Sequence, residues 1–400
     1  MKRGISLLLC LLLALSACAA GEGEAHGGMA FALAWMKSDS VRGEENAVIS
    51  PVSAYLALTM AAMGAEGETW DELARVFGED EAWPDHAAAL MKIFTKDKKN
   101  KVKIENSAWT AERVELQKSY RRALKRMLSA QTFSTALSEE GGMKAINDWV
   151  KENTEGMIDR LLSKPLSEDT VLALINTVYF KGQWSELFQT ELTQKGEFTR
   201  DDGEVVETDF MRQNNHFRYW ALKDGAQAIR IPYEGDEKAF LAILPPEGVS
   251  ADEYLNALSA DTLAEMQGSF ERASTVASYE RVILRMPRID AGCTLDVKAF
   301  LSEMGVKRAF DPAQARFGKL LTGDESVWIS QILQKTRLKL DEKGTEASAA
   351  TAIVAEATSA RIPEEPIELT LDRSFLYIIY DEGAEMPLFM GKVTNPAANA

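Results

Sequence analysis

Few residues in this chain could perform catalysis. Among 400 residues there are three histidines and three cysteines. Two of the cysteines lie within the first eighteen residues, which leaves Cys293 alone beyond them, so no internal disulfide framework can form. No HExxH, CxxC, P-loop or GxSxG motif occurs, and the Gly-Glu-Gly sequence at 21–23 lacks the third glycine of a dinucleotide fingerprint. The sequence therefore predicts no enzymatic activity, no bound metal and no cofactor.

Cys18 is the exception, because its neighbours give the thiol a defined chemistry. Lys2 and Arg3 precede an apolar run over Ile5–Leu15 that is too short to span a membrane, which is typical of a secretory signal. The run ends in Leu15-Ser16-Ala17-Cys18, which resembles a bacterial lipobox, where the peptide is cut before the Cys and the thiol is lipidated. An ordinary signal peptide with an incidental Cys is the alternative.

This cleavage pattern divides the chain into three parts. Residues 1–17 form the signal peptide, residues 18–28 form a flexible Gly-rich tether, and residues 29–400 form a single domain with no linker or repeat. No later apolar stretch reaches membrane-spanning length. We therefore expect a secreted protein at the bacterial cell surface or envelope, attached to the membrane only through an N-terminal lipid.

The overall charge argues against a nucleic-acid partner. The formal net charge is -16, from 45 basic and 61 acidic residues, whereas phosphate backbones bind basic surfaces. The one basic concentration is a lysine cluster formed by Lys92, Lys96, Lys98, Lys99, Lys101 and Lys103. This cluster is either a solvated turn or a site for a polyanion, and the lack of interleaved aromatic residues favours the turn.

The segment from Glu342 to Ser359 has a pattern that more than one structure could satisfy. It contains no Pro and a single Gly, near its start. One alternating face is small or apolar and uncharged, and consists of Thr345, Ala347, Ala349, Thr351, Ile353, Ala355 and Ala357. A period of two is typical of a strand, but the high Ala content favours a helix. The pattern alone therefore leaves a strand, an Ala-rich helix and a disordered linker open.

Hydrophobic periodicity predicts the elements around this segment. Helices are expected at residues 50–64, from Thr69 onward with Glu72 completing a capping box, at 120–128 and at 142–152. Strands are expected at 172–180, 239–244, 282–289, 328–340 and 375–380, with one more helix at 295–304. Helices in the first third followed by strands indicate an α+β fold.

Six sequence blocks resemble the serpin family of serine protease inhibitors. They are Glu342-Lys343-Gly344-Thr345-Glu346-Ala347, Ile49-Ser50-Pro51-Val52-Ser53, Gly64-Ala65-Glu66-Gly67-Glu68-Thr69, Asn176-Thr177-Val178-Tyr179-Phe180-Lys181-Gly182-Gln183-Trp184, Met286-Pro287-Arg288-Ile289 and Pro387-Leu388-Phe389-Met390-Gly391-Lys392-Val393-Thr394-Asn395-Pro396. The resemblance extends from about Met29 to Pro396. It implies an α+β serpin fold with three β-sheets, a large central one among them, about eight or nine surrounding helices and an exposed reactive-centre loop at about 342–366.

The resemblance also implies an irreversible suicide inhibitor. A protease attacks the loop of such a protein and forms an acyl-enzyme, the hinge side of the cut loop inserts into the central sheet, and deacylation stalls. The inserting face must be small and uncharged, as Thr345, Ala347 and Ala349 are. We expect a monomer whose partner is a serine protease, with a cysteine protease as a lesser option. The alternatives are a non-inhibitory serpin with a binding or chaperone-like role and, more remotely, a secreted hydrolase.

Individual residues take their roles from the same resemblance. The hinge comprises Glu342, Gly344, Thr345, Glu346, Ala347 and Ala349. The polar shutter beneath the opening strands, together with the point where the loop enters, comprises Ser50, Ser53, Asn176, Trp184, Arg288 and Gln334. An ion pair between Glu342 and Arg288 is expected at the entry point. The family commonly has a His near Gln334, and Gln can form hydrogen bonds there without titrating.

The resemblance implies a reactive bond at Thr358-Ser359, because serpins keep a characteristic spacing between the hinge glutamate, here Glu342, and this bond. A small β-branched residue before this bond suits the shallow pocket of an elastase-like or subtilisin-like protease. Arg361-Ile362 is the rival bond, because a basic residue suits a trypsin-like pocket with a buried carboxylate. The stretch that follows is about one residue longer than the family pattern, so Ala357 or Ser359 could also precede the cut.

Overall fold

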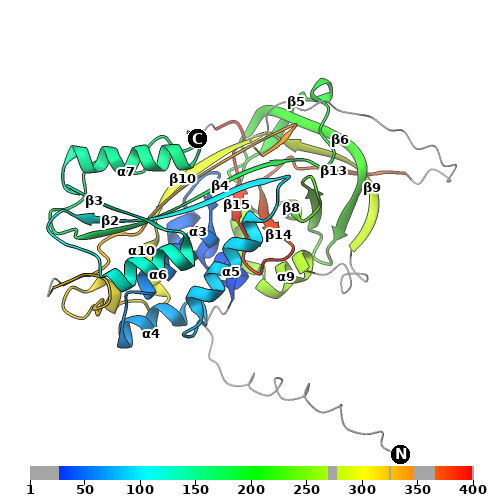
Figure 1. Cartoon of the computed structure of the whole chain (residues 1–400). Helices are drawn as coiled ribbons and strands as arrows, with labels where there is room; N and C mark the ends of the chain where they lie inside the picture. The colour runs from blue at the N-terminus through cyan, green and yellow to red at the C-terminus, as the bar shows by residue number, and fades with distance from the viewer. Residues whose placement is uncertain (1–26, 269–276, 324–325, 346–364, 399–400) are drawn as a thin grey trace, which may run out of the picture.

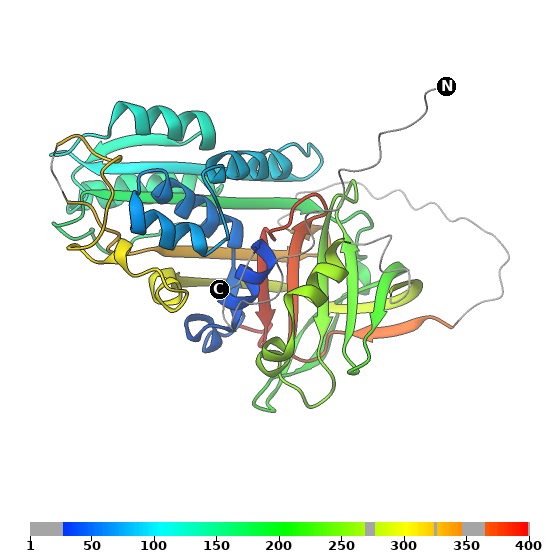
Figure 2. The same ribbon diagram turned by 90° about the horizontal axis from the view of Figure 1, so that it is seen from below.

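The computed structural model describes residues 27–268, 277–323, 326–345 and 365–398. Ten α-helices and two β-sheets in these ranges form a mixed α+β fold. Figure 1 shows α4, α6 and α7 at one end of the molecule and β5, β6 and β9 at the other, with β4 running between the two ends, and Figure 2 shows the same division from below. No helix among the described residues is both long enough and apolar enough to cross a membrane.

The larger sheet has nine strands in the order β1-β15-β14-β8-β7-β6-β9-β13, with β5 paired to β6. Their bounds are β1 Val48–Ile49, β5 Gln194–Thr199, β6 Val205–Ala221, β7 Gln227–Pro232, β8 Lys238–Leu244, β9 Ala277–Pro287, β13 Ile367–Thr370, β14 Phe375–Asp381 and β15 Phe389–Val393. Strands β8, β14 and β15 are buried along their whole length, in keeping with sequences that are apolar apart from Lys238, Asp381 and Lys392.

The second sheet has six strands in the order β10-β11-β12-β4-β2-β3. Their bounds are β2 Lys101–Ala111, β3 Gln131–Thr135, β4 Leu172–Gln183, β10 Ile289–Asp296, β11 Leu333–Asp341 and β12 Gly344–Thr345. The first third of the chain was expected to be helical, but it also contains strand β2. This strand includes Lys101 and Lys103 of the lysine cluster. Its charged and apolar residues alternate from Lys101 to Glu105, which is strand periodicity, and Val102 and Ile104 are buried.

The helices match the expected positions more closely than the expected number, which was eight or nine. They are α1 Gly28–Lys37, α2 Asp39–Arg42, α3 Pro51–Ala62, α4 Gly67–Arg75, α5 Trp83–Thr95, α6 Lys118–Leu128, α7 Glu140–Asn153, α8 Ala251–Ala257, α9 Ala260–Gly268 and α10 Val297–Glu303. Helix α10 is shorter than the expected 295–304, because Leu295 and Asp296 complete β10.

Two further expectations differ from the structure. Three sheets were expected, but the hydrogen bonds define two. The reason is the 17-residue strand β6, which pairs with β5 and β9 and also with β7, and so joins two groups of strands into one sheet. The expected strand at 328–340 begins only at Leu333, and the residues before it are irregular.

The capping box expected at Thr69 and Glu72 is wrong. Helix α4 begins two residues earlier, at Gly67. The Thr69 hydroxyl accepts a hydrogen bond from the backbone N–H of Arg316 at 3.0 Å, and the Glu72 carboxylate accepts from the N–H groups of Lys307 and Arg308. Both side chains therefore satisfy backbone groups of a distant segment.

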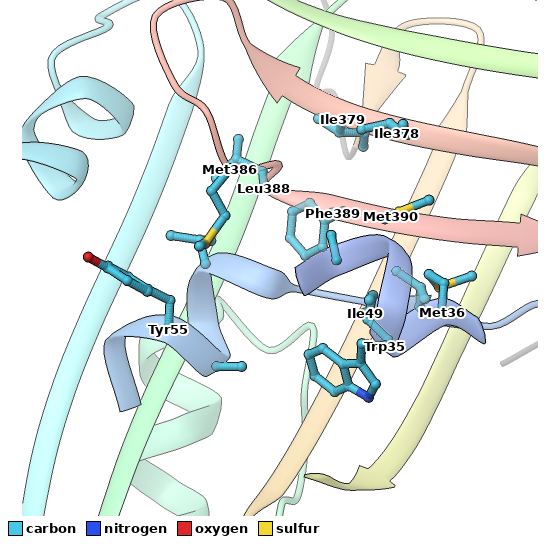
Figure 3. Packing of buried hydrophobic residues seen from close by; sticks show 14 of the residues in the cluster. Trp35, Met36, Ile49, Tyr55, Ile378, Ile379, Met386, Leu388, Phe389 and Met390 are labelled. Carbon is cyan, nitrogen blue, oxygen red and sulfur yellow. The ribbon is translucent and has the colours of Figure 1, made fainter. Parts of the chain in front are cut away.

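The central core joins the N-terminal helices to the C-terminal strands. Figure 3 shows Trp35 of α1 and Ile49 of β1 near Phe389 and Met390 of β15, with Ile378 on the neighbouring strand β14. These side chains are buried almost completely. Because α1 and β15 lie near opposite ends of the sequence, this core joins the two ends of the domain.

Candidate functional site

The hinge begins as a two-residue strand between two long ones. Gly344 and Thr345 of β12 pair with Gln183 and Gly182 of β4 on one side, and with Asp341 and Leu340 of β11 on the other. Both pairings are antiparallel, so β4 and β11 run parallel to each other. Across their described lengths β4 and β11 form no ladder with one another. The sheet therefore has a seam with β12 at one end.

Small cavities mark this seam below β12. A void of about 10 Å³ is lined by Val178 and Phe180 of β4, Leu338 of β11 and Thr345. Farther along the seam, a cavity of about 110 Å³ is lined by the first residues of β4, by Ile146 of α7 and by the segment that leads into β11. Interiors normally close such gaps, so the seam is a region of incomplete packing.

Gly344 occupies a position that other residues could not take. Its φ of 141° lies in the region that favours glycine. A Cβ atom at this position would lie 2.0 Å from the Gly182 carbonyl oxygen and 2.9 Å from the Gln183 Cα atom. The close approach of the two backbones requires glycine, and it lets β12 enter the sheet beside β4.

Thr345 is anchored beneath the sheet by an aromatic pair. Its hydroxyl lies 2.6 Å from the Tyr233 hydroxyl, and both residues are buried. The Tyr233 ring stacks on Trp184 at 4.6 Å between centroids. The Trp184 indole N–H donates to the Asp341 carbonyl at 3.0 Å, and its backbone N–H donates to the Lys343 carbonyl at 2.9 Å. Burial raises the pKa of Tyr233, which keeps the phenol protonated.

Glu342 forms a buried carboxylate site just before β12. Its Oε1 atom lies 2.5 Å from Nη2 of Arg288, and the Thr193 hydroxyl donates to the same oxygen at 2.7 Å. Arg288 also binds Asp209 at 2.9 Å. Burial by itself would raise the pKa of Glu342, but the hydrogen bonds from Arg288 and Thr193 outweigh burial and lower it. The Glu342 hydrogen bond raises the pKa of Arg288, so both groups stay charged.

Ser50 and Gln334 form one polar contact beneath the seam. The Ser50 backbone N–H donates to Gln334 Oε1 at 2.9 Å, and Gln334 Nε2 donates to the Ser50 carbonyl at 2.9 Å. The Ser50 hydroxyl donates to the Leu388 carbonyl, and Thr336 donates to Gln334 Oε1 at 3.2 Å. All of these groups are buried, so the contact ties β11 to the start of α3.

Asn176 belongs to a separate polar contact one strand away. Its Nδ2 atom donates to Asn106 Oδ1 at 2.8 Å, and Asn106 donates to the Leu128 carbonyl. Among the described residues, Asn176 Oδ1 is buried without a hydrogen-bond partner. Ser53 is buried in α3 and forms none of these bonds to Gln334 or Asn176. The expected single cluster is therefore two contacts on opposite sides of the seam.

Sequence reasoning missed several residues of this site, namely Asn106, Thr193, Tyr233 and Thr336. Asn106 lies between Glu105 and Ser107 in β2, so its neighbours in the sequence gave no signal of a buried polar contact. Thr193 and Tyr233 come from segments distant in sequence, and nothing local distinguishes them.

Seven expected site residues lie outside the described part of the chain, and so does the lipidation candidate Cys18. The seven are Glu346, Ala347, Ala349, Thr358, Ser359, Arg361 and Ile362. The lysine cluster is described, and it is spread from α5 to β2 rather than confined to a turn. Lys101 of this cluster forms an ion pair with Glu155.

Comparison with known proteins identifies the class. The profile of the family described as "Serpin (serine protease inhibitor)" matches residues 26–396. Human glia-derived nexin is 30% identical over 364 residues, which cover 89% of each chain. Human antithrombin-III is 28% identical over 372 residues, covering 90% of this chain and 78% of that protein. The chain belongs to the serpin family, whose members are generally protease inhibitors and not enzymes.

Solved structures of this class superimpose over nearly the whole chain. The thermophilic serpin tengpin in its native state has a TM-score of 0.81 at 29% identity and covers 95% of this chain and 96% of its own. Tengpin in its latent state has a TM-score of 0.74. A complex of thyroxine-binding globulin with thyroxine has a TM-score of 0.79 at 25% identity, covering 93% of this chain and 98% of its own.

Proposed function

We propose that this serpin is an irreversible inhibitor of serine proteases that inserts its cleaved loop between β4 and β11. The open seam with β12 at one end carries this proposal, since two parallel strands without a shared ladder can accept a third strand between them. The higher similarity to native than to latent tengpin agrees with a chain whose seam is still open.

The register of β12 defines the inserted state that we propose. Continued by two residues, it places Ala347 between Phe180 and Leu338, which are the next inward-facing residues of β4 and β11. Two further residues place Ala349 between Val178 and Thr336. The methyl groups of alanine suit these narrow positions, whereas a charged side chain would lose its hydration there.

Continued again by two residues, the register places Thr351 between Asn176 and Gln334. Asn176 Oδ1 is a buried acceptor without a partner among the described residues. A threonine hydroxyl is a donor of suitable size for this oxygen. Insertion would thus pair a buried polar group whose isolation costs about 1–3 kcal/mol.

Insertion follows covalent attack by the protease. The catalytic serine oxygen of the protease attacks the carbonyl carbon of Thr358, and the peptide bond to Ser359 breaks. The serine proton passes through the protease's base to the departing amine of Ser359, which leaves an ester between the two proteins. About a dozen new backbone hydrogen bonds at 0.5–1.5 kcal/mol each would release on the order of 10 kcal/mol. That is more than the roughly 3–4 kcal/mol contributed by an oxyanion-hole donor, so distortion can stall deacylation.

Incubation with an elastase-class protease tests the proposal. We expect an adduct that resists boiling in detergent, at close to one inhibitor per trapped protease. Complete loop cleavage without an adduct would contradict inhibition. It would favour the alternative of a non-inhibitory serpin, a class that includes ligand binders such as thyroxine-binding globulin.

The same reaction locates the reactive bond. Mass spectrometry of the released C-terminal fragment should give Ser359 as its first residue. A fragment that begins at Ile362 would instead assign the bond to Arg361 and a trypsin-like target.

Attachment to a membrane through Cys18 is a further proposal that rests on the sequence pattern alone. In a bacterial host, the full-length protein should partition with membranes and incorporate labelled palmitate. Cys18→Ala should abolish both, and Cys293→Ala is the matched control because that thiol is buried far along the chain. Membrane association of Cys18→Ala at the wild-type level would contradict lipidation.

A further inference from the structure

One face of the β6–β9 ladder carries basic groups directly opposite one another. Arg212 of β6 lies opposite Arg285 of β9, and His216 lies opposite Arg281. Like charges in directly opposed positions destabilise a sheet. The chain has more acidic than basic residues, so partners of opposite charge are abundant elsewhere in the molecule. We call the set Arg212, His216, Arg281 and Arg285 the arginine face.

The arginine face is open to solvent. Arg281 and His216 are exposed and Arg212 and Arg285 are half-buried, while the alternate residues of both strands point into the core. None of the three arginines forms an ion pair with any described residue. Arg281 donates to Asn214 at 3.2 Å, and Arg285 lies 5.4 Å from the centre of the Phe210 ring. The guanidinium groups thus keep donors available for an external partner.

An exposed aromatic residue borders the arginine face. The Tyr279 side chain lies on β9 with 74% of the residue exposed, and its ring stacks on His216 at 5.8 Å. Tyrosine and arginine are both enriched at the energetically dominant positions of protein interfaces. Glu368 of β13 lies opposite Ile283 and near the face, so the basic set has an acidic border.

The arginine face lies beside β13, the first described strand after the proposed reactive bond. Strand β13 begins at Ile367, which pairs with Val282, the residue next to Arg281 (Figure 1). Ile367 follows Ser359 by eight positions, so the chain between them can span at most about 25–30 Å. A small domain is about 30 Å across, so a protease bound at the reactive bond would extend over this face.

We propose that the arginine face is a docking surface for an acidic patch on the target protease. This inference rests on the proposed inhibitory function and adds a chemical character for the target. The exposed Tyr279 at its border favours a protein partner over a free polyanion, because a tyrosine ring supplies contact area that a protein surface can bury and a flexible polyanion uses little. Complementary charge mainly accelerates association, so the expected effect is on the rate of trapping.

A matched pair of proteases tests the inference. An elastase-class protease is compared with the same protease after succinylation of its surface lysines, once both forms turn over a chromogenic peptide equally. The second-order rate constant for adduct formation should be about tenfold higher for the succinylated form at low salt, and the advantage should shrink at 0.5 M NaCl. The triple variant Arg212→Ser, Arg281→Ser, Arg285→Ser should lose most of the advantage.

A second triple variant controls for net charge. Arg121→Ser, Arg122→Ser and Arg126→Ser remove three exposed charges from α6 and should keep the advantage. Equal loss in both variants, or no loss in the first, would overturn the inference. So would loss of binding to a sulfated polysaccharide with unchanged trapping rates, since the face would then be a polyanion site.

Two measurements separate docking from the other ways in which the experiment can fail. If no adduct forms, the proposed inhibition fails, and docking is measured with protease whose catalytic serine is replaced by alanine. An equal Kd for wild type and the arginine-face triple variant would overturn the inference by itself. The single variant Arg212→Ser should keep or raise the melting temperature, because it removes one member of a like-charge pair. A lower melting temperature would mark a structural role instead.

Discussion

At the scale of single residues, the hinge is held by contacts that each depend on one chemical property. Gly344 is needed because it has no Cβ, Thr345 because its hydroxyl meets Tyr233, and Glu342 because its carboxylate is charged. A substitution that removes one of these properties removes the contact that depends on it. The effect of such a substitution on stability or on protease trapping can therefore be predicted for each of the three residues.

Gly344→Ala should destabilise the intact protein by about 1–3 kcal/mol. The new methyl group would collide with the Gly182 carbonyl, and the positive φ would add strain. Urea unfolding of intact protein measures the loss. Gly43→Ala is the control, because its φ is -85° and nothing lies near its added Cβ. Equal stabilities of the two variants would contradict the geometry of β12.

Glu342→Gln should cost about 1–2 kcal/mol at pH 7, since Arg288 would lose a charged acceptor but is itself partly exposed. The folded pKa of Glu342 is lowered, so its contribution is full above the unfolded value of about 4.3 and is lost as the pH falls through the folded value. The difference between wild type and variant should therefore shrink below about pH 4. Denaturant melts at several pH values measure it.

Asp148→Asn is the matched control for that experiment. Asp148 pairs with Lys144 on the surface of α7, where both side chains are largely exposed. Such pairs contribute little, so this variant should change stability by less than about 0.5 kcal/mol at any pH. A difference for Glu342→Gln that persists undiminished at acid pH would contradict the ion pair as its cause.

At the scale of elements, the seam is defined by what β4 and β11 each bind on their far sides. Strand β4 pairs along ten residues with β2, and β11 pairs along eight residues with β10. Between them, as far as the structure describes the chain, two residues of β12 are paired on each side. β4 and β11 are thus each held by a long ladder on the outer side and by few hydrogen bonds on the side of the seam, which is the arrangement that insertion needs.

Thr345→Arg should convert the inhibitor into a substrate. A guanidinium cannot enter the buried site beneath β12 without losing its hydration, so insertion should be slower than deacylation. Gels should show cleaved monomer in place of adduct. Thr345→Ser retains the hydroxyl for Tyr233 and should keep an adduct yield close to that of wild type. An unchanged yield for Thr345→Arg would mean that insertion does not limit trapping.

At the scale of the whole molecule, the fold keeps its core complete while one sheet remains unfinished. The N-terminal helices and the C-terminal strands share the core of Figure 3, and the residues labelled there belong to neither β4 nor β11. The chain can therefore be stable as a domain and still hold unrealised strand pairing.

Cleavage within the loop should raise the melting temperature by more than about 10 °C. On the order of 10 kcal/mol of new pairing spread over a chain of this size corresponds to a shift of that scale. Calorimetry of intact and cleaved protein measures it, with cleaved Thr345→Arg as the control that should show a smaller gain. Identical melting of intact and cleaved wild type would contradict storage of free energy in the seam.

The sequence by itself determined the class of the molecule. The α+β character and several helices and strands followed from periodicity, because burial of one face is written locally into the spacing of apolar residues. The family followed from blocks such as 176–184 and 387–396, whose residues match as a group. Gly344 and Thr345 were assigned to the hinge for the same reason, because they belong to the matching block 342–347.

Only the tertiary structure decided which distant residues meet. Tyr233 and Thr193 reach the hinge from β-strand connections far from it in sequence, and Asn176 turned out to bind Asn106 and not the Ser50–Gln334 contact. Hydrogen bonds between remote segments also decide how strands are paired. They determine the pairing register, the sharing of the long strand β6 between neighbours, and the position of Arg212 opposite Arg285. Such contacts are set by global packing, and local spacing carries no record of them.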